Sequence, residues 1–350
     1  IGLELLILFN SRRVASLGFG SALFVSALIR KLVSCPEILI IATPEAPIPV
    51  DKAQIVIIIL YIEFYIRISL KYYMIIWLAS YPKSGNTWLR MFLKSYFLKS
   101  NEKFSLDGSF LDSFKSQGFP DQKMLDHLKV DYSKFEEIVK NWETMQDYIN
   151  LNKRTNYVKT HNAMCTVGSY KFTSSRNTKG VIYIVRDPRD VLVSLSHHMG
   201  LNYEQTFEHL SSSYNFEYPS SGDKNYKKSL MGSWSDHYKS WKNHKFCKIL
   251  IIKYEDMILD ELKTFTNVID YLRELDDVNL NNDKLKKALK QTQFNELQKL
   301  EKSEGFIEKG KGELFFRKGK IGTWKGEVSS KIINKIEALF KSEMEELDYL

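Results

Sequence analysis

Eight consecutive residues near position 85 have the composition of an anion-binding loop. They read Tyr81-Pro82-Lys83-Ser84-Gly85-Asn86-Thr87-Trp88 and lie between an apolar run and a segment with helical spacing. In such a loop the glycine permits close approach of a ligand, and the amides at the start of the following helix point toward it. The loop is not a Walker A sequence, because its lysine precedes the only glycine. Taken alone, it fits a strand–turn–helix corner with an exposed lysine about equally well.

Three later segments combine basic residues with hydroxyl groups or a histidine. They are Lys159-Thr160-His161, the segment 185–194 with Arg186 near its start, and the lysine- and glycine-rich segment 317–325. Arginine offers a planar fork to phosphate, whereas lysine acts as a mobile point charge. A lone histidine is more often structural than catalytic, and this holds for His161 taken alone.

Together these four segments resemble the signature motifs of the PAPS-dependent sulfotransferases, where PAPS is 3′-phosphoadenosine 5′-phosphosulfate. Residues 81–88 resemble the family's 5′-phosphosulfate loop, and residues 185–194 resemble its 3′-phosphate motif. Lys159-Thr160-His161 is similar to the strand end that supplies the catalytic base, and residues 317–325 are similar to the R-K-G-x-x-G-x-W-K signature. The motifs occur in the family's order, and the likeness extends over residues 75–340. It implies a PAPS-dependent sulfotransferase with a P-loop-like fold.

The resemblance implies two anion cradles and an adenine site. The cradle for the 5′-phosphosulfate would consist of Lys83, Ser84, Gly85, Asn86 and Thr87. The cradle for the 3′-phosphate would consist of Arg186, Ser194, Arg317, Lys318 and Gly319. Adenine would lie between Trp88 and Phe294, with Tyr254 and Thr292 as weaker matches to family contacts. Phe294 also suits a core-facing position on a helix.

The predicted chemistry is in-line sulfuryl transfer to a small alcohol, phenol or amine, with adenosine 3′,5′-bisphosphate (PAP) as the second product. Positioning and electrostatics should supply most of the catalysis, as in phosphoryl transfer. His161 is the predicted general base, and Lys83 is expected to neutralise the leaving oxygen. Lys159 should contact the sulfuryl oxygens, since residues two apart on a strand point to the same side. A sulfuryl group carries less charge than a phosphoryl group, and no metal-site pattern occurs, so we expect no metal.

The pattern from Met74 onward predicts an α/β fold, a three-layer α/β/α arrangement around a mainly parallel sheet. Apolar runs at 75–80, 180–185 and 248–253 are typical of buried parallel strands, and 156–160 is expected to be a further strand of this sheet. Helices are expected at 87–98, at 190–198 and within 276–302. In such sheets ligands bind at the carboxyl ends of the strands. Each of the first three motifs follows one of these ends.

Residues 1–73 are expected to be a non-native or unrelated extension, and residues 74–350 to form the sulfotransferase domain. The reason is that Met74 directly precedes the motif-bearing strand, while residues 1–73 contain no Met. The alternative is a membrane anchor, as in a Golgi-type carbohydrate sulfotransferase. The run Val14–Ile29 approaches the roughly 20 apolar residues that a membrane-spanning helix needs.

Composition narrows the partners and the compartment. Lys and Arg number 50 against 42 Asp and Glu, which gives a formal charge of +8. Such a charge suits nucleic acid, a phospholipid surface or a small polyphosphorylated ligand, and the motifs favour the small ligand, so no nucleic-acid partner is expected. Three cysteines without C-x-x-C spacing indicate reduced thiols and a cytoplasmic location.

Two rival functions share some of these features. A P-loop-like nucleotide kinase would have the same sheet and an anion loop, but it needs Walker A spacing and a metal-binding carboxylate. A non-enzymatic polyanion-binding module would explain the charge, yet it has no need of His161 beside Lys159.

Two departures from the family pattern bear on the surface and on assembly. Thr323 stands where Asp is common, and we expect this to be a tolerated, surface-like change. The family's dimerisation motif, K-x-x-x-T-V-x-x-x-E, falls on Lys325–Asn334, where only the lysine matches, so the oligomeric state stays open. The acceptor is not specified, although aromatic residues within 99–150 and 199–231 could line a pocket.

Overall fold

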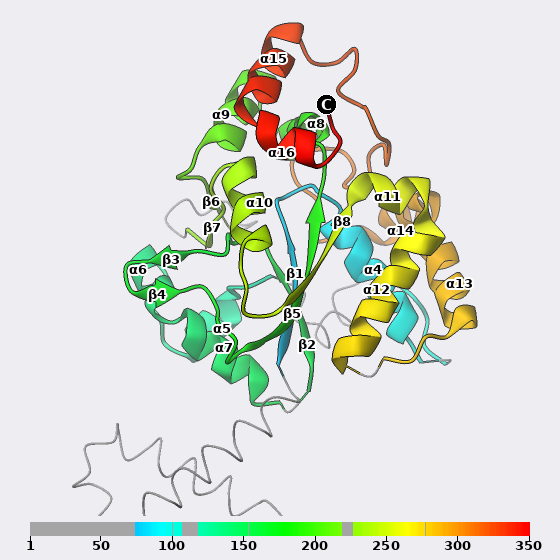
Figure 1. Ribbon diagram of the computed structural model, residues 1–350. Coiled ribbons are helices and arrows are strands. Elements are labelled where there is room, and N and C mark those ends of the chain that lie inside the picture. Colours follow the sequence, from blue (N-terminus) through cyan, green and yellow to red (C-terminus); the bar gives the residue numbers. More distant parts are fainter. Residues whose placement is uncertain (1–73, 100, 107–117, 153, 219–226, 277) are drawn as a thin grey trace, which may run out of the picture. The chain divides into compact units, whose positions relative to one another are not determined.

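Four parallel strands form the central sheet, in the order β2-β1-β5-β8 (Figure 1). The computed structural model describes residues 74–99, 101–106, 118–152, 154–218, 227–276 and 278–350. The strands are Ile75–Ser80 (β1), Asn156–Thr160 (β2), Thr178–Val185 (β5) and Lys248–Lys253 (β8). The predicted extension at 1–73 lies outside the described residues.

Successive residues of β1 enter two different apolar clusters. Trp77 and Ala79 pack into one cluster, and Ile76 and Leu78 into the other. Successive side chains on a strand point to opposite faces, so both faces of the sheet are buried, as parallel sheets require. This double burial explains why the strand reads as a continuous apolar run.

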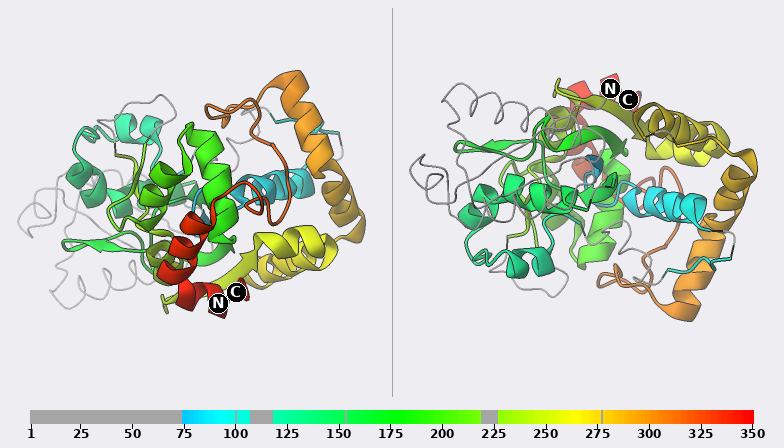
Figure 2. Two further views of the ribbon diagram at one scale, coloured as in Figure 1. Left: turned by 90° about the horizontal axis from the view of Figure 1, so that it is seen from above. Right: turned by 90° about the horizontal axis from the view of Figure 1, so that it is seen from below.

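Helices cover both faces of the sheet (Figures 1 and 2). One cluster takes side chains from α7, α8, α10 and α15, and the other from α4, α12 and α13. The described helices are α4 (Asn86–Phe97), α5 (Gln122–His127), α6 (Phe135–Lys140), α7 (Trp142–Asn150), α8 (Pro188–Met199), α9 (Tyr203–Ser211), α10 (Trp234–Lys242), α11 (Tyr254–Leu259), α12 (Glu261–Asp276), α13 (Asn282–Gln291), α14 (Phe294–Glu304), α15 (Ser330–Leu339) and α16 (Lys341–Glu346). Two short antiparallel hairpins add β3 (Thr166–Val167) with β4 (Tyr170–Lys171), and β6 (Phe216–Glu217) with β7 (Ser229–Leu230).

The predicted α/β fold with a central parallel sheet is confirmed. Three strands have the predicted bounds, and β5 begins two residues earlier than the expected 180–185. The helical region expected within 276–302 consists of two helices, α13 and α14, with Thr292 at the C-terminal cap of the first. Within the described ranges, no helix combines the length and apolarity needed to cross a bilayer.

Candidate active site at the carboxyl edge of the sheet

The parallel register brings the first three motifs to one edge of the sheet. Ala79 pairs with Thr160, Ser80 with Ile184, and Val185 with Lys253, so these four strands end at similar heights. The loop 81–88, His161, Arg186 and Tyr254 directly follow those ends. Segments at least 25 residues apart in sequence therefore meet here, as the fold type predicts.

Two residues of the loop 81–88 have left-handed backbone conformations. Gly85, the N-terminal cap of α4, has φ 105°, and a Cβ at this position would lie 2.7 Å from the Tyr254 ring. Lys83 has φ 66°, which is strained for a residue with a side chain. The conformation and the contact with Tyr254 together require glycine at position 85, and the strain at Lys83 falls on a predicted catalytic residue.

The Lys83 ammonium lies in a site that is short of negative charge. It sits 3.8 Å from the centre of the Phe315 ring. Burial, with the neighbouring charges of Arg186 and Lys159, lowers the pKa of Lys83 to about 7, although Glu308 opposes this. Burial also lowers the pKa of Lys159. An anion bound beside these two lysines would raise the pKa of both.

The side chain of Asn86 is committed to the protein itself. Its amide nitrogen donates to the Leu78 carbonyl oxygen at 2.9 Å, and its amide oxygen accepts from Arg90 Nε at 3.0 Å. The side chain therefore ties the start of α4 to β1, and the contribution of Asn86 to a ligand would come from its backbone N–H.

His161 is held in a single tautomer. Its Nδ1 lies 2.7 Å from the carbonyl oxygen of Ser80. A carbonyl oxygen can only accept, so Nδ1 carries the ring hydrogen and Nε2 is the basic nitrogen. Burial, assisted by Lys159, lowers the pKa of His161 to about 3, so the imidazole is neutral near pH 7. A neutral ring with a basic Nε2 is the form that a general base needs.

A second buried histidine fixes the backbone of His161. His237 on α10 donates from Nε2 to the carbonyl oxygen of His161 at 3.1 Å, and its Nδ1 accepts from Tyr183 at 2.9 Å. Trp241 donates to the carbonyl oxygen of the next residue, Asn162, at 3.0 Å. Sequence reasoning missed His237 and Trp241, because no local pattern shows that α10 packs against the end of β2.

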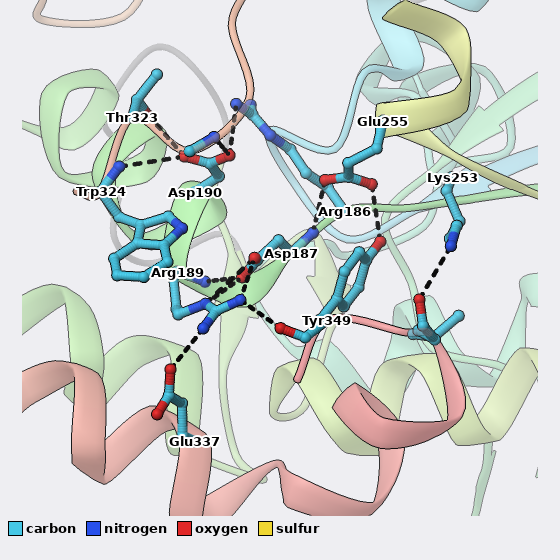
Figure 3. Close-up of polar contacts among 12 residues, drawn as sticks. Arg186, Asp187, Arg189, Asp190, Lys253, Glu255, Thr323, Trp324, Glu337 and Tyr349 are labelled. Carbon is cyan, nitrogen blue, oxygen red and sulfur yellow. Dashed lines mark hydrogen bonds and ion pairs between the residues drawn. The ribbon is translucent and has the colours of Figure 1, made fainter. Parts of the chain in front are cut away.

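Arg186 joins three of the predicted segments. Its guanidinium donates to the carbonyl oxygens of Lys83 and Lys320, each at 3.2 Å, and lies 4.1 Å from the centre of the Tyr254 ring. Its Nη2 is also 3.9 Å from Asp190 (Figure 3). The predicted 3′-phosphate residue is thus in contact with the loop 81–88 and with the segment 317–325.

Asp190 anchors the segment 317–325 to α8 (Figure 3). The fully buried carboxylate accepts from Gly322 N and from the Thr323 hydroxyl, both at 2.7 Å, and from Trp324 N at 3.3 Å. Thr323 is therefore not the surface-like position expected from the sequence, because its hydroxyl pairs with a buried carboxylate. An aspartate in its place would face Asp190 with a second negative charge.

The turn at Arg317-Lys318-Gly319 is the more open part of the predicted 3′ cradle. Arg317 is half-buried, and Lys318 is exposed and forms an ion pair with Glu327. Gly319 has φ 58°, and a Cβ there would lie 2.2 Å from the Phe294 ring, so only glycine fits. Ser194 is half-buried on α8.

The four predicted adenine residues are Trp88, Tyr254, Thr292 and Phe294. Trp88 and Phe294 both pack against one apolar cluster, and Trp88 lies edge-on to Tyr254 at 6.2 Å between ring centres. Thr292 is fully buried, and its hydroxyl donates to the Ala288 carbonyl oxygen within the helix at 2.8 Å. Thr292 thus has a structural bond of its own, while the adenine roles of these four residues stay predictions.

Three buried polar atoms in the described part of this region are available to a ligand. Among the described residues, Ser84 Oγ, Trp88 Nε1 and Arg186 Nε are buried without a hydrogen-bond partner. Each is a hydrogen-bond donor, and orphaned buried donors are costly unless a ligand satisfies them. They lie in the segments assigned to the phosphosulfate, to adenine and to the 3′-phosphate, so the donor set fits PAPS. In the described part of the chain, no group of three His, Cys, Asp or Glu side chains is placed to hold a metal ion.

A carboxylate that the sequence analysis missed lies against the start of α4. Glu308 accepts from the Thr87 hydroxyl at 2.8 Å and from Arg90 Nη2 at 2.7 and 2.8 Å. Burial by itself would raise the pKa of the Glu308 carboxyl. The charges of Arg90 and Lys159 outweigh burial and keep this pKa well below its usual range. No local signal marks Glu308, because Thr87 and Arg90 are more than 200 residues away in sequence.

The aromatic residues considered for an acceptor pocket are scattered. Phe104 and Phe119 are buried in different apolar clusters, whereas Tyr214 is 84% exposed. Others near 110 and 114 lie outside the described residues. Burial in separate clusters is evidence of core packing for Phe104 and Phe119.

Comparisons with known proteins agree with this geometry. The sequence model of a family described as "Sulfotransferase domain" matches residues 75–348. Luciferin sulfotransferase of Photinus pyralis is 28% identical over 285 residues, which cover 74% of this chain and 68% of that protein. Flavonol 3-sulfotransferase of Flaveria bidentis is 26% identical over 285 residues, covering 77% and 81%. Among solved structures, mouse sulfotransferase SULT7A1 complexed with PAP matches with a TM-score of 0.50 at 22% identity, covering 80% of this chain and 89% of that one.

Proposed function

The chain belongs to the sulfotransferase domain family and is a PAPS-dependent transferase, and from this premise we propose how it catalyses the reaction. The sulfuryl group of PAPS passes in line to a hydroxyl or amine of a small acceptor, and His161 acts as the general base. The observation that carries the proposal is the single tautomer of His161, fixed by the bond from Nδ1 to Ser80. That tautomer turns Nε2 into the proton acceptor.

The loop 81–88 and the Arg186 region hold the two charged ends of the co-substrate. Lys83, the Ser84 hydroxyl and the amides at the start of α4 bind the phosphosulfate, and Arg186 with the turn 317–319 binds the 3′-phosphate. The orphaned donors Ser84 Oγ and Arg186 Nε support this assignment. Trp88 and Phe294 contact adenine.

His161 Nε2 takes the acceptor proton as the acceptor atom forms its bond to sulfur and the bond from sulfur to the bridging oxygen breaks. Lys83 neutralises the charge that develops on that oxygen, and Lys159 contacts the sulfuryl oxygens. An imidazole with a pKa near 3 would be a weak base. The negative charges of bound PAPS, which lie beside Lys159, raise the pKa of His161. The site therefore becomes competent as a base when the co-substrate is bound.

The acceptor side and the compartment follow from weaker observations. We keep an alcohol, phenol or amine as the acceptor class, since the curated relatives include luciferin, flavonol and amine sulfotransferases. Cys165 and Cys247 are both free thiols, which supports a reducing compartment such as the cytoplasm. The domain proposal for residues 74–350 is supported by the family match at 75–348.

The test is a comparison of His161→Ala with wild type and with His127→Ala, an exposed histidine on α5. PAP binding is measured by calorimetry, and turnover as PAP release from PAPS with a panel of alcohols, phenols and amines. His161→Ala should bind PAP nearly normally and lose about 10²–10⁴ in turnover, as expected for loss of a general base. His127→Ala should match wild type in both assays.

The same assays separate the rival functions. If His161→Ala is active, another residue must be the general base. A kinase would release ADP from ATP and lose activity in EDTA, whereas we expect EDTA to leave PAP release unchanged. A wild-type protein that binds PAP but turns over no acceptor would favour a binding module.

A further inference from the structure

Glu308 contacts two residues that the proposed function places at the phosphosulfate, Thr87 at the start of α4 and Lys159. Its carboxylate accepts from the Thr87 hydroxyl at 2.8 Å and lies 3.8 Å from the Lys159 ammonium. Arg90, in the second turn of α4, reaches both carboxylate oxygens from Nη2 at 2.7 and 2.8 Å. A hydroxyl, a guanidinium and an ammonium around two oxygens form a typical oxyanion site.

The Thr87 hydroxyl cannot serve the carboxylate and a phosphosulfate together. A threonine has one O–H donor, and here it points to Glu308. Arg90 Nη2 donates to the Thr87 oxygen at 3.0 Å, so this oxygen already accepts a hydrogen bond and the hydroxyl hydrogen is directed at the carboxylate. A second anion beside an ionised carboxylate would also be repelled across a partly desolvated site. The two anions therefore compete for Thr87.

Glu308 lies on a loop that is closed at its base. The loop follows α14, and the buried Glu301 carboxylate accepts from the backbone N–H groups of Phe315 and Phe316 at 2.6 and 2.9 Å. One side of the loop is held by a bond from Lys311 N to the His198 carbonyl oxygen at 3.0 Å. Because Glu301 joins the two ends of the loop, Glu308 can leave Thr87 without displacing the Arg317 turn.

Gly305 begins this loop, three residues before Glu308. It has φ 77°, and nothing lies within 4 Å of a Cβ built at this position. A glycine in open space allows the backbone to rotate at little cost. The next residue, Phe306, is buried and packs against the rings of Phe315 and Phe316 at 5.1 and 5.5 Å, so the stretch that carries Glu308 away from Thr87 begins at the exposed Ile307.

We propose that Glu308 is an internal competitor of the co-substrate, a carboxylate that occupies the oxyanion site at Thr87 and Arg90 and must leave it when the phosphosulfate binds. Glu308 thereby weakens nucleotide binding and speeds release of the PAP product. This inference rests on the proposed function, since it assumes that the loop 81–88 binds the 5′ end of PAPS and PAP.

The experiment measures the affinity and the dissociation rate of PAP for the full chain, for Glu308→Gln and for Glu313→Gln. The control, Glu313, is an exposed carboxylate on the same loop. Glu308→Gln removes the charge while keeping the side-chain shape. It should bind PAP about tenfold more tightly, with most of the gain in slower dissociation, because one charge-assisted competitor is lost. Glu313→Gln should equal wild type.

The outcomes separate this inference from the proposed function. If wild type does not bind PAP, the proposed function fails. If wild type binds PAP and the folded Glu308→Gln variant binds it equally or more weakly, Glu308 is only a structural support of Arg90 and the inference is wrong. If Glu308→Gln does not fold, Glu308→Asp is the test, because its shorter side chain weakens the contact with Thr87. Tighter PAP binding by Glu308→Asp would support competition, and equal or weaker binding would overturn it.

Discussion

The two anion cradles at the carboxyl edge of the sheet are built in different ways. The cradle at residues 83–87 lies between β1 and α4, with a fully buried Ser84 and a lysine whose pKa burial lowers to about 7. The turn at 317–319 is more open, and its Lys318 is paired with Glu327 at the surface. Only Arg186, 7% exposed, gives the second cradle a buried cation.

The difference shows where electrostatic energy is concentrated. A charge in a partly desolvated site interacts more strongly with an anion than one that water and salt screen. The first cradle and Arg186 should therefore dominate the binding of the nucleotide and the chemistry, while Lys318 should contribute little. Four predictions test this ranking, from the largest effect to the smallest.

Lys83→Ala should have the largest effect, because Lys83 is assigned both to the bound anion and to the leaving oxygen. We expect turnover to fall by about 10²-fold or more, in line with loss of one preorganised charge at a transition state, and PAP affinity to fall as well. The measurement is PAP release under saturating PAPS, together with calorimetry of PAP. Normal turnover in this variant would remove Lys83 from the chemistry and leave the first cradle as a binding site only.

Arg186→Ala should abolish the preference for a 3′-phosphate. Loss of a charge-assisted contact costs about 1.5–3 kcal/mol, so the ratio of the dissociation constants of AMP and PAP should fall about ten- to a hundredfold. The ratio is the informative quantity, because Arg186 also bonds to Lys83 and Lys320, and any general loosening of the site affects both nucleotides. An unchanged ratio would place the 3′-phosphate elsewhere.

PAP binding should weaken as the pH rises above 7. Burial, with Arg186 and Lys159, lowers the pKa of Lys83 to about 7 against the opposing charge of Glu308, so above that pH the lysine must regain a proton when the anion binds. The dissociation constant should then rise up to about tenfold per pH unit between pH 8 and 9. Lys83→Arg, which stays charged, should flatten this slope, and calorimetry in buffers of different ionisation heat should detect less proton uptake in this variant than in wild type.

Lys318→Ala should have the smallest effect. The lysine is exposed and paired with Glu327, and such surface charges are worth about 0–1 kcal/mol, so PAP affinity should change by no more than about fivefold. The change should disappear at high salt, whereas the effect of Arg186→Ala should persist. A loss as large as that of Arg186→Ala would mean that the turn at 317–319 closes over the nucleotide and is not the weaker cradle.

Much of this architecture could be predicted because its signals are local. The apolar runs of β1 and β5 reflect burial on both faces, and the loop 81–88 reflects the turn between β1 and α4. Parallel strands end at one edge, so the strand pattern alone brought Lys83, His161 and Arg186 together. The helical prediction for 276–302 missed the break at Thr292, where the hydroxyl bonds back to Ala288 within the helix.

The partners of the site residues could not be predicted in the same way. Thr323 was expected to be surface-like, but its hydroxyl bonds to the buried Asp190, a contact that depends on how the segment 317–325 folds over α8. His237 is buried beneath His161, and Glu308 reaches Thr87 across the sequence. Each of these contacts joins residues on different elements, and no periodicity records such a pairing.

The sequence by itself thus determined the family, the parallel sheet and the identity of the predicted catalytic and phosphate-binding side chains. Those depend on backbone preferences and side-chain types within short segments. Only the tertiary structure decided the tautomer of His161, the lowered pKa of Lys83 and the carboxylate opposite Thr87. The physical reason is that desolvation and pairing of charges depend on which distant groups become neighbours when the chain is packed.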